Sequence, residues 1–487
     1  MRFTIPYFSL LLLLLSTVVN SAESIEADNQ TFTRKKQSLL DIYLLAQQND
    51  PTWSAAQFSN TAAQEKLEQG KALFRPTVNF NSSYTRSNTD IRYIGGNTVF
   101  NNNNQSEAFN TLNYGVNVNQ PLYRQQNIVQ YQQSTLQVQI ADLQLEQQRQ
   151  ELMAKSAQVY FDVLLAQDKL TLNQAQKNAI TGQLAQAKAN FKAGIATITD
   201  VDESQAKFDL VESQNISISN EMESKKQAVQ ILTGQYPSEF IGLQSTISPM
   251  LPSTNSVPAT GPITSSSAST LIPNKPEAAS LSYWMQQASL SNIELAVARL
   301  NTELANKEVS LNKATHQPTL DAVASYNKTN ANGGINGFGN DLNNATIGLQ
   351  LQIPLYQGGA ISSKVREAIA NQQKAQQQLE VARRKAELDT RQAYLDITTS
   401  ISQSAANEQS LRSAQSQLAS TNKGFKVGIR TSVDILNAQQ QVFNAKRDLL
   451  QAQYSYLLGL VKLKYAVGIL QHEDLDDVNQ QLVRVVD

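Results

Sequence analysis

The residues best equipped for chemistry lie in two ten-residue stretches with the same pattern. FKAGIATITD at residues 191–200 returns as FKVGIRTSVD at residues 425–434, a spacing of 234 residues (425 − 191). Each copy ends in an aspartate, Asp200 or Asp434, but only the second contains an arginine, Arg430, where the first has Ala196. The shared residues fit a structural role in a turn, and position 430 is the one place where the two copies differ in charge.

The rest of the sequence offers little for catalysis. It contains no cysteine and only two histidines, His316 and His472, both expected at the surface. No Ser/His/Asp or Cys/His set, phosphate-binding glycine loop or metal-ligand spacing is present. We therefore expect no enzymatic activity, no cofactor and no bound metal. A net charge of −1 also argues against a nucleic-acid partner, which selects for basic surfaces.

The repeated stretch reads as a tight turn between two helices. Gly194 and Gly428 allow the positive φ that such a turn requires. Asp200 and Asp434 fall in the first turn of the following helix, where a carboxylate favours the positive end of the helix dipole. Two hydroxyl residues in each copy are candidate N-caps: Thr197 or Thr199, and Thr431 or Ser432.

The N-terminus, residues 1–22, has the form of a secretory signal peptide. A thin positive start, Arg2, precedes an apolar run and then small residues. A membrane anchor is the alternative, which the short length and flanks of the run disfavour. No later stretch reaches the roughly 18 apolar residues of a membrane helix. We expect an exported protein.

The remainder is an internal duplication. Each half shows a helical pattern (near 39–57 and 282–300), two extended segments around an Asn/Gly-rich loop, a long helical stretch, the turn and a further helix. Both second extended segments end in Pro-Leu-Tyr, at 121–123 and 354–356. The predicted organisation is a first repeat at 23–234, a linker at 235–276, a second repeat at 277–466 and a C-terminal segment at 467–487.

The extended segments alternate between apolar and polar residues. This period of two describes a half-buried strand of a sandwich, and equally a membrane barrel strand with lipid on one face and water on the other. One apolar set is Leu112, Tyr114, Val116 and Val118, and the other is Ile347, Leu349, Leu351 and Ile353. Four strands cannot close a membrane barrel, whose minimum is about eight. Membrane strands therefore require several copies to share one barrel.

The helical stretches are long and narrowly apolar. Residues 124–190 contain no proline and one glycine, enough for roughly 100 Å of helix. After the second turn, apolar and small residues recur at the 3/4 spacing of a coiled-coil seam: Ile435, Ala438, Val442, Ala445, Leu449, Ala452, Tyr456, Gly459, Leu463 and Ala466. Helices with one narrow seam suit the wall of a hollow tube or, alternatively, a rod-like coiled coil.

Taken in order, these features resemble the TolC family of outer-membrane efflux and secretion channels. The resemblance runs from about Ser38 to about Leu475 and rests on the two Pro-Leu-Tyr exits, the two turns, and a Tyr-x-Asp pair at 160–162 and 394–396. It implies a mostly α protein with a β-barrel part. Three copies would form a twelve-stranded outer-membrane barrel continuous with a twelve-helix periplasmic barrel, and 235–276 and 467–487 would form an equatorial band.

The resemblance also assigns the turns to a gate at the periplasmic mouth. Arg430 would link to Thr199 and Asp200 of a neighbouring copy and hold the mouth closed. The family usually has a supporting tyrosine where this chain has Phe425, which implies one link fewer. Two acidic rings are usual at the constriction.

Asp434 matches the first acidic ring, but the second falls on the neutral Asn437. Three Asp434 carboxylates would still bind cations, in a weaker ring than is usual.

The turn tips would receive partners. In the family, a periplasmic adaptor docks on them and, with an inner-membrane RND or ABC transporter, opens the mouth. The apolar tip residues here are Ala193, Gly194, Ile195, Val427, Gly428 and Ile429.

The implied function is the exit duct for drug efflux or type I secretion in the outer membrane of a Gram-negative bacterium, in contact with outer-membrane lipid. The competing hypothesis is a secreted coiled-coil scaffold without a pore. The sequence does not identify the cargo.

Overall fold

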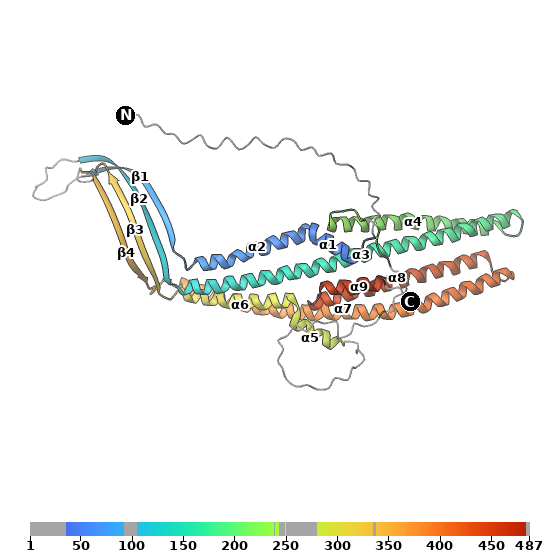
Figure 1. Cartoon of the computed structure of the whole chain (residues 1–487). Coiled ribbons are helices and arrows are strands. Elements are labelled where there is room, and N and C mark those ends of the chain that lie inside the picture. Colours follow the sequence, from blue (N-terminus) through green and yellow to red (C-terminus); the bar gives the residue numbers. More distant parts are fainter. Residues whose placement is uncertain are drawn as a thin grey trace, which may run out of the picture.

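The structure, a computed structural model, describes residues 36–91, 105–237, 239–242, 249, 280–334 and 338–483. The predicted signal peptide and most of the predicted linker fall outside these ranges. A β-sheet occupies one end of the molecule, two interhelical turns occupy the other, and long helices run between them (Figure 1).

The two halves contain the same elements in the same order. The first half consists of α1 (Leu39–Asn49), α2 (Pro51–Ala72), β1 (Thr77–Ile91), β2 (Gln105–Tyr123), α3 (Gln125–Lys192) and α4 (Ile198–Thr233). The second consists of α5 (Leu281–Ser291), α6 (Ile293–Ala314), β3 (Thr319–Ala331), β4 (Asn340–Gln352), α7 (Ala360–Lys426) and α8 (Ser432–Val467), followed by α9 (His472–Val483). Within the described ranges, no helix has the length and apolar character needed to cross a membrane.

Each half opens with two helices where the sequence pattern suggested one helical stretch. Asp50 ends α1 and caps α2, accepting a hydrogen bond from the Thr52 backbone N–H at 3.0 Å. Pro51 follows as the first residue of α2, where its missing N–H costs nothing. Asn292 makes the matching break between α5 and α6, accepting from the Leu295 N–H at 2.9 Å.

The four strands form one antiparallel sheet in the order β1-β2-β3-β4. On one face Val116 lies opposite Phe80 and Tyr326, and on the other Asn117 lies opposite Asn79 and Ser325. The predicted alternation is therefore an apolar face and an amide- and hydroxyl-rich face. β1 and β4 are the two edges of the sheet, and β4 is exposed along its whole length.

The predicted coiled-coil seam of α8 packs as expected. Nine of its ten positions are buried, and Ala466 is half-buried. The two hairpins, α3–α4 and α7–α8, lie side by side (Figure 1). A small apolar cluster of Ile180, Val211 and Leu436 joins them part-way to the turns.

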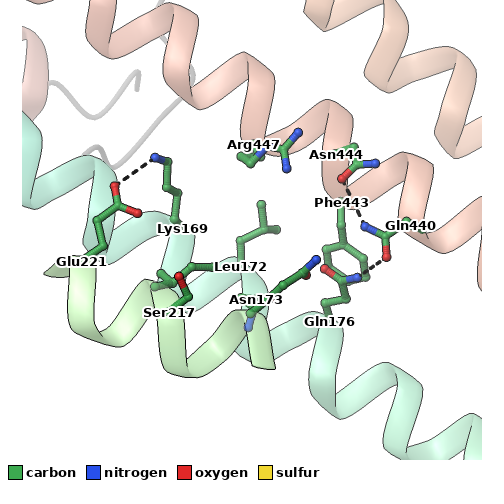
Figure 2. Close-up of a pocket in the computed structure, with 12 residues that line it drawn as sticks. Lys169, Leu172, Asn173, Gln176, Ser217, Glu221, Gln440, Phe443, Asn444 and Arg447 are labelled. Atoms are coloured by element: carbon green, nitrogen blue, oxygen red, sulfur yellow. Dashed lines mark hydrogen bonds and ion pairs between the residues drawn. The ribbon is translucent and has the colours of Figure 1, made fainter. Parts of the chain in front are cut away.

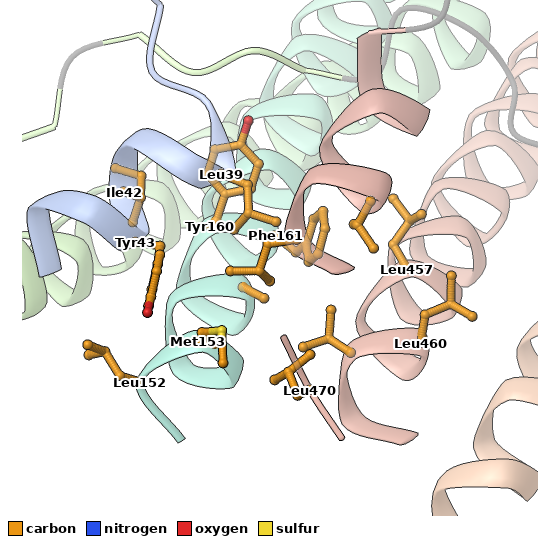
Figure 3. Close-up of a cluster of buried hydrophobic side chains, with 14 of the residues drawn as sticks. Leu39, Ile42, Tyr43, Leu152, Met153, Tyr160, Phe161, Leu457, Leu460 and Leu470 are labelled. Carbon is orange, nitrogen blue, oxygen red and sulfur yellow. The ribbon is translucent and has the colours of Figure 1, made fainter. Parts of the chain in front are cut away.

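The main hydrophobic core lies part-way along the long helices, where α1, α5 and α9 pack against them. Figure 3 shows the part of this core that lies between α1, α3 and α8. Its largest fully buried side chains include Trp284, Tyr160 and Phe161. The Tyr160 hydroxyl donates to the Ile241 carbonyl at 2.8 Å, which fastens the segment after α4. Leu475 of α9 is fully buried, so the C-terminal segment is part of this core.

Candidate functional site at the interhelical turns

Two turns with the same backbone form connect the long helices at the end away from the sheet (Figure 1). Gly194 and Gly428 have φ values of +76° and +79°, as their glycine identity predicted. The Gly194 N–H donates to Phe191 O at 3.0 Å and the Ile195 N–H to Asn190 O at 2.9 Å. Gly428 and the residue after it repeat both bonds at 3.0 Å. Each long helix thus ends in a Schellman motif, which satisfies its last carbonyls.

A capping box starts each returning helix. The Thr197 hydroxyl accepts from the Asp200 N–H at 3.3 Å, and the Asp200 carboxylate accepts from the Thr197 N–H at 3.0 Å. Thr431 and Asp434 form the same pair of bonds at 3.2 and 2.9 Å. Both aspartates therefore lie in the first helical turn, as predicted, and are held in place by the backbone.

The structure decides between the candidate N-caps. Thr197 and Thr431 are the caps, so the alternatives Thr199 and Ser432 are wrong for this role. Ser432 has no acidic residue three positions later, as a capping box requires. Thr199 has Asp202 at that spacing, but it already lies inside α4, which begins at Ile198. Thr199 instead lies exposed on the first turn of α4, beside Asp200.

Arg430 and Asp434 approach each other within one chain. The Arg430 Nη1 atom lies 4.0 Å from Asp434 Oδ1, and both side chains are partly exposed. Hydrogen bonds from the Thr431 backbone and hydroxyl, with a smaller effect of the Arg430 charge, lower the pKa of Asp434. Asp434 is therefore a fixed, ionised carboxylate at the turn.

Gly424 was not singled out by the sequence. A Cβ at this position would lie 2.7 Å from Arg430 Cγ and 3.4 Å from Ile429 Cγ1. The arginine stem thus lies back over the last turn of α7, in space that only a glycine leaves. The first copy has Asn190 and Ala196 at these places. The simultaneous change to Gly424 and Arg430 in the second copy could therefore have indicated their contact from the sequence.

The other predicted site residues occupy the expected elements. Phe425 is half-buried in the last turn of α7, and Asn437 is exposed on α8, three residues after Asp434. Residues three apart share a side of a helix, so positions 434 and 437 present their side chains in the same direction.

The tips are apolar and open. Ile195, Val427 and Ile429 are 78%, 72% and 77% exposed, and Ala193 and both glycines are exposed too. Contiguous exposed apolar surface is typical of interaction sites.

A cleft of about 290 Å³ lies between the two hairpins, and Figure 2 shows the residues that line it. Its walls come from α3, α4 and α8 and include five amide side chains. Gln176 Nε2 donates to Gln440 Oε1 at 2.5 Å, and Gln440 Nε2 donates to Asn444 Oδ1 at 3.1 Å. Phe443 and an ion pair of Lys169 with Glu221 also line the cleft. The contact between Gln176 of α3 and Gln440 of α8 joins one hairpin to the other.

No metal site is found among the residues that the structure describes: they contain no group of three or more His, Asp or Glu placed around one point. The chemistry available at the turns is that of exposed charges and apolar tips. Such groups bind partners and ions and do not transform a substrate.

Comparison with known proteins agrees with this picture. The family model described as "Outer membrane efflux protein" matches residues 42–235 and 284–469. "Outer membrane protein TolC" of Vibrio cholerae is 31% identical over 448 residues, covering 92% of this chain and 94% of the relative. "Proteases secretion protein PrtF" of Dickeya chrysanthemi is 29% identical over 439 residues, covering 90% and 89%.

The fold is shared with solved channels. The Campylobacter jejuni CmeC outer membrane channel superposes with a TM-score of 0.69 at 17% identity, covering 96% of this chain and 98% of that one. The two chains thus share the same overall fold. By its sequence and its fold, the chain belongs to the outer membrane efflux protein family.

Proposed function

We propose that three copies of this chain assemble into one exit duct. Each copy supplies four strands to a twelve-stranded barrel and its long helices to a continuous tunnel. The observation that carries this proposal is the open sheet. Four strands with an apolar face and two free edges cannot persist in a membrane alone, because unpaired edge groups have no water to bind there. Closure through further copies pairs both edges.

The turns act as the gate of this duct. Arg430 of one copy links to Thr199 and Asp200 of the next and holds the mouth closed. The support is that Arg430 lies exposed at the mouth with its head 4.0 Å from the nearest carboxylate, longer than a hydrogen bond. Phe425 has no hydroxyl to add a second link. The gate is therefore held by fewer polar contacts than a tyrosine at that place would give.

Three Asp434 carboxylates form a ring at the constriction. A ring of carboxylates favours cations, which bind between the charges and obstruct the pore. The neutral Asn437, next along the same side of α8, leaves this ring single. We expect cation selectivity and a moderate block by divalent and trivalent cations.

The partners are a periplasmic adaptor and an inner-membrane transporter of the RND or ABC class. The open apolar tips support an adaptor that adds helices to the hairpins. The names of the relatives support both cargo classes, since two are protease secretion proteins and one is an outer membrane efflux protein. We propose that the duct serves efflux, type I secretion or both.

The test is single-channel conductance of the detergent-purified protein in a planar bilayer. We expect a small, stable, cation-selective conductance that cations added on the periplasmic side block. Arg430→Ser should enlarge the resting conductance, because it removes the link between copies. Lys426→Ser, four residues earlier and also exposed, is the matched control and should leave it unchanged.

Two outcomes contradict the proposal. Correctly inserted trimers whose resting conductance is the same with and without Arg430 refute the gate. A protein that needs no detergent, forms no trimer and never conducts refutes the duct, and favours a secreted coiled-coil scaffold instead.

A further inference from the structure

The boundary between the two repeats contains a pair of polar contacts between α3 and α6. Lys307 Nζ donates to Gln132 Oε1 at 3.1 Å. Gln133 Nε2 donates to Glu308 Oε2 at 2.8 Å. These contacts lie near the sheet and join the first repeat to the second within one chain.

Helix α6 meets two neighbours through different residues. Thr302 and Asn306 face α7: the Thr302 hydroxyl donates to the Ala375 carbonyl at 3.4 Å, and Gln372 Nε2 donates to Asn306 Oδ1 at 2.7 Å. Positions 307 and 308 contact α3 instead. Helix α6 thus contacts its own repeat with one side and the first repeat with another.

Helix α2 is the counterpart of α6 and uses only the first of these sides. Both helices have 22 residues, so Pro51 corresponds to Ile293, and positions 60 and 64 correspond to 302 and 306. Asn60 and Gln64 both donate to Asp142 of α3, at 2.9 and 2.7 Å. Positions 65 and 66, the counterparts of 307 and 308, are exposed.

On helix α7, the side that corresponds to the α6-facing side of α3 is exposed. The spacing of 234 residues that relates the two turns also relates Tyr160 to Tyr394, and it maps Gln132 and Gln133 onto Arg366 and Glu367. Gln133 is buried against α6, whereas Glu367, its counterpart, is exposed. α7 therefore presents outward the side that α3 covers with α6.

The four outward residues match in charge. Position 366 is arginine and its counterpart across the seam, position 65, is glutamate; position 367 is glutamate and its counterpart, position 66, is lysine. Each α3–α6 contact within the chain pairs an amide with a charged residue. The opposite charges at positions 65, 66, 366 and 367 are therefore not inherited from the duplicated sequence. Both pairs would be complementary only if α7 of one chain meets α2 of another.

We propose that α7 of one copy docks on α2 of the next in the register of the internal α3–α6 contact, with Arg366 bound to Glu65 and Glu367 bound to Lys66 of the neighbouring copy. This proposal rests on the trimeric duct proposed above and names the residues that select its neighbours. Exposed ion pairs contribute little affinity but discriminate strongly between correct and incorrect partners. Here the two ion pairs favour the contact of α7 with α2 of a neighbouring copy over an incorrect contact between repeats of the same chain.

An apolar stripe continues the same seam toward the turns. Val381, Leu388 and Leu395 recur every seven residues on α7 and are all exposed. Leu395 corresponds to Phe161 of α3, which is buried with its ring 6.1 Å from that of Tyr454 on α8. Since α4 is the counterpart of α8, this stripe would lie against α4 of the neighbouring copy.

Charge reversal tests the pairs. Lys66→Glu and Glu367→Lys should each lower the fraction of detergent-resistant trimer several-fold at low salt, and the double variant should restore it. The loss should shrink at high salt, which a defect in folding would not show. Lys364→Glu makes the same charge change three residues from Glu367, at the counterpart of the exposed Gln130, and should have no effect.

Cross-linking tests the register independently, because the chain has no cysteine of its own. A Glu65→Cys, Arg366→Cys variant treated with a short bis-maleimide should give covalent dimers and trimers. The matched control, Gln132→Cys with Lys307→Cys, should link within one chain and give no increase in mass.

The outcomes separate this proposal from the duct itself. Trimers that form and conduct, but give no intermolecular link at 65 and 366 and no rescue by the double reversal, refute the seam and leave the duct standing. A wild-type protein that never forms trimers refutes the duct and the seam together.

Discussion

The side chain of Arg430 lies on Gly424, with its Cγ atom 2.7 Å from the place that a Cβ would occupy. Gly424→Ala should therefore displace Arg430 without removing its charge. Alanine favours the helix over glycine, so α7 itself should not weaken. We expect a larger resting conductance than in the wild type, measured in single channels. Asn190→Ala, at the same place in the first turn, is the control; an unchanged conductance in both variants would mean that the position of the Arg430 stem does not matter.

Gly428→Ala should destabilise the second turn. Its φ of +79° is a conformation that costs an alanine roughly 1–2 kcal/mol, and no atom within 4 Å of the added Cβ offsets or aggravates this. Gly182→Ala is a matched control, because Gly182 lies in α3 with equally open surroundings and should gain up to about 1 kcal/mol. Thermal unfolding of the two variants should shift in opposite directions, and shifts of the same sign would contradict the turn geometry.

Cation block should depend on pH through Asp434. Its pKa is lowered, so the carboxylate stays charged as the pH falls through the ordinary aspartate value of about 3.9, and it is neutralised only at more acidic pH. Block by divalent cations should therefore persist through that range and disappear below it. Asp434→Asn should abolish the block at every pH; a block that survives this change must come from another site.

The stability of the helical part should fall as the pH rises. Burial raises the pKa of Asp168 on α3, although Tyr454 of α8 donates a hydrogen bond to it at 2.6 Å. The folded state therefore favours the protonated acid, and this contribution is lost as the pH rises through the raised pKa. Asp168→Asn keeps an acceptor for Tyr454 and should unfold at a higher temperature than the wild type at neutral pH, but not in acid. Asp209→Asn, at an exposed position of α4, should show no such difference.

Much of the architecture could be predicted from the sequence because the internal duplication gives the pattern of each element twice. The family model and the named relatives confirm the predicted family, the outer-membrane location and the role as an exit duct for efflux and type I secretion. The family is also one without enzymatic activity. The seam of α8 and the glycines of both turns were readable because helical periodicity and positive φ restrict residue type strongly.

Other features depend on spacing in three dimensions. The choice of Thr197 over Thr199 rests on the two hydrogen bonds that Thr197 exchanges with Asp200, and both residues suit an N-cap by type. The contact between Gly424 and Arg430 spans the turn itself, so neither residue type alone predicts it. The break at Asp50 did have a signal in the sequence, because an N-cap aspartate followed by proline is typical of the start of a new helix.

The placement of the hydrophobic core gives the long helices a gradient of compliance. Around Phe161 they are clamped by a large cluster, further along by three apolar residues including Leu436, and at the turns by backbone bonds and two capping boxes. Amide protons should exchange with solvent progressively faster along α8 from Leu457 toward Asp434. The long helices are therefore stiff around the main hydrophobic core and flexible at the turns. A small force at the tips can separate them while the region around the core keeps its shape.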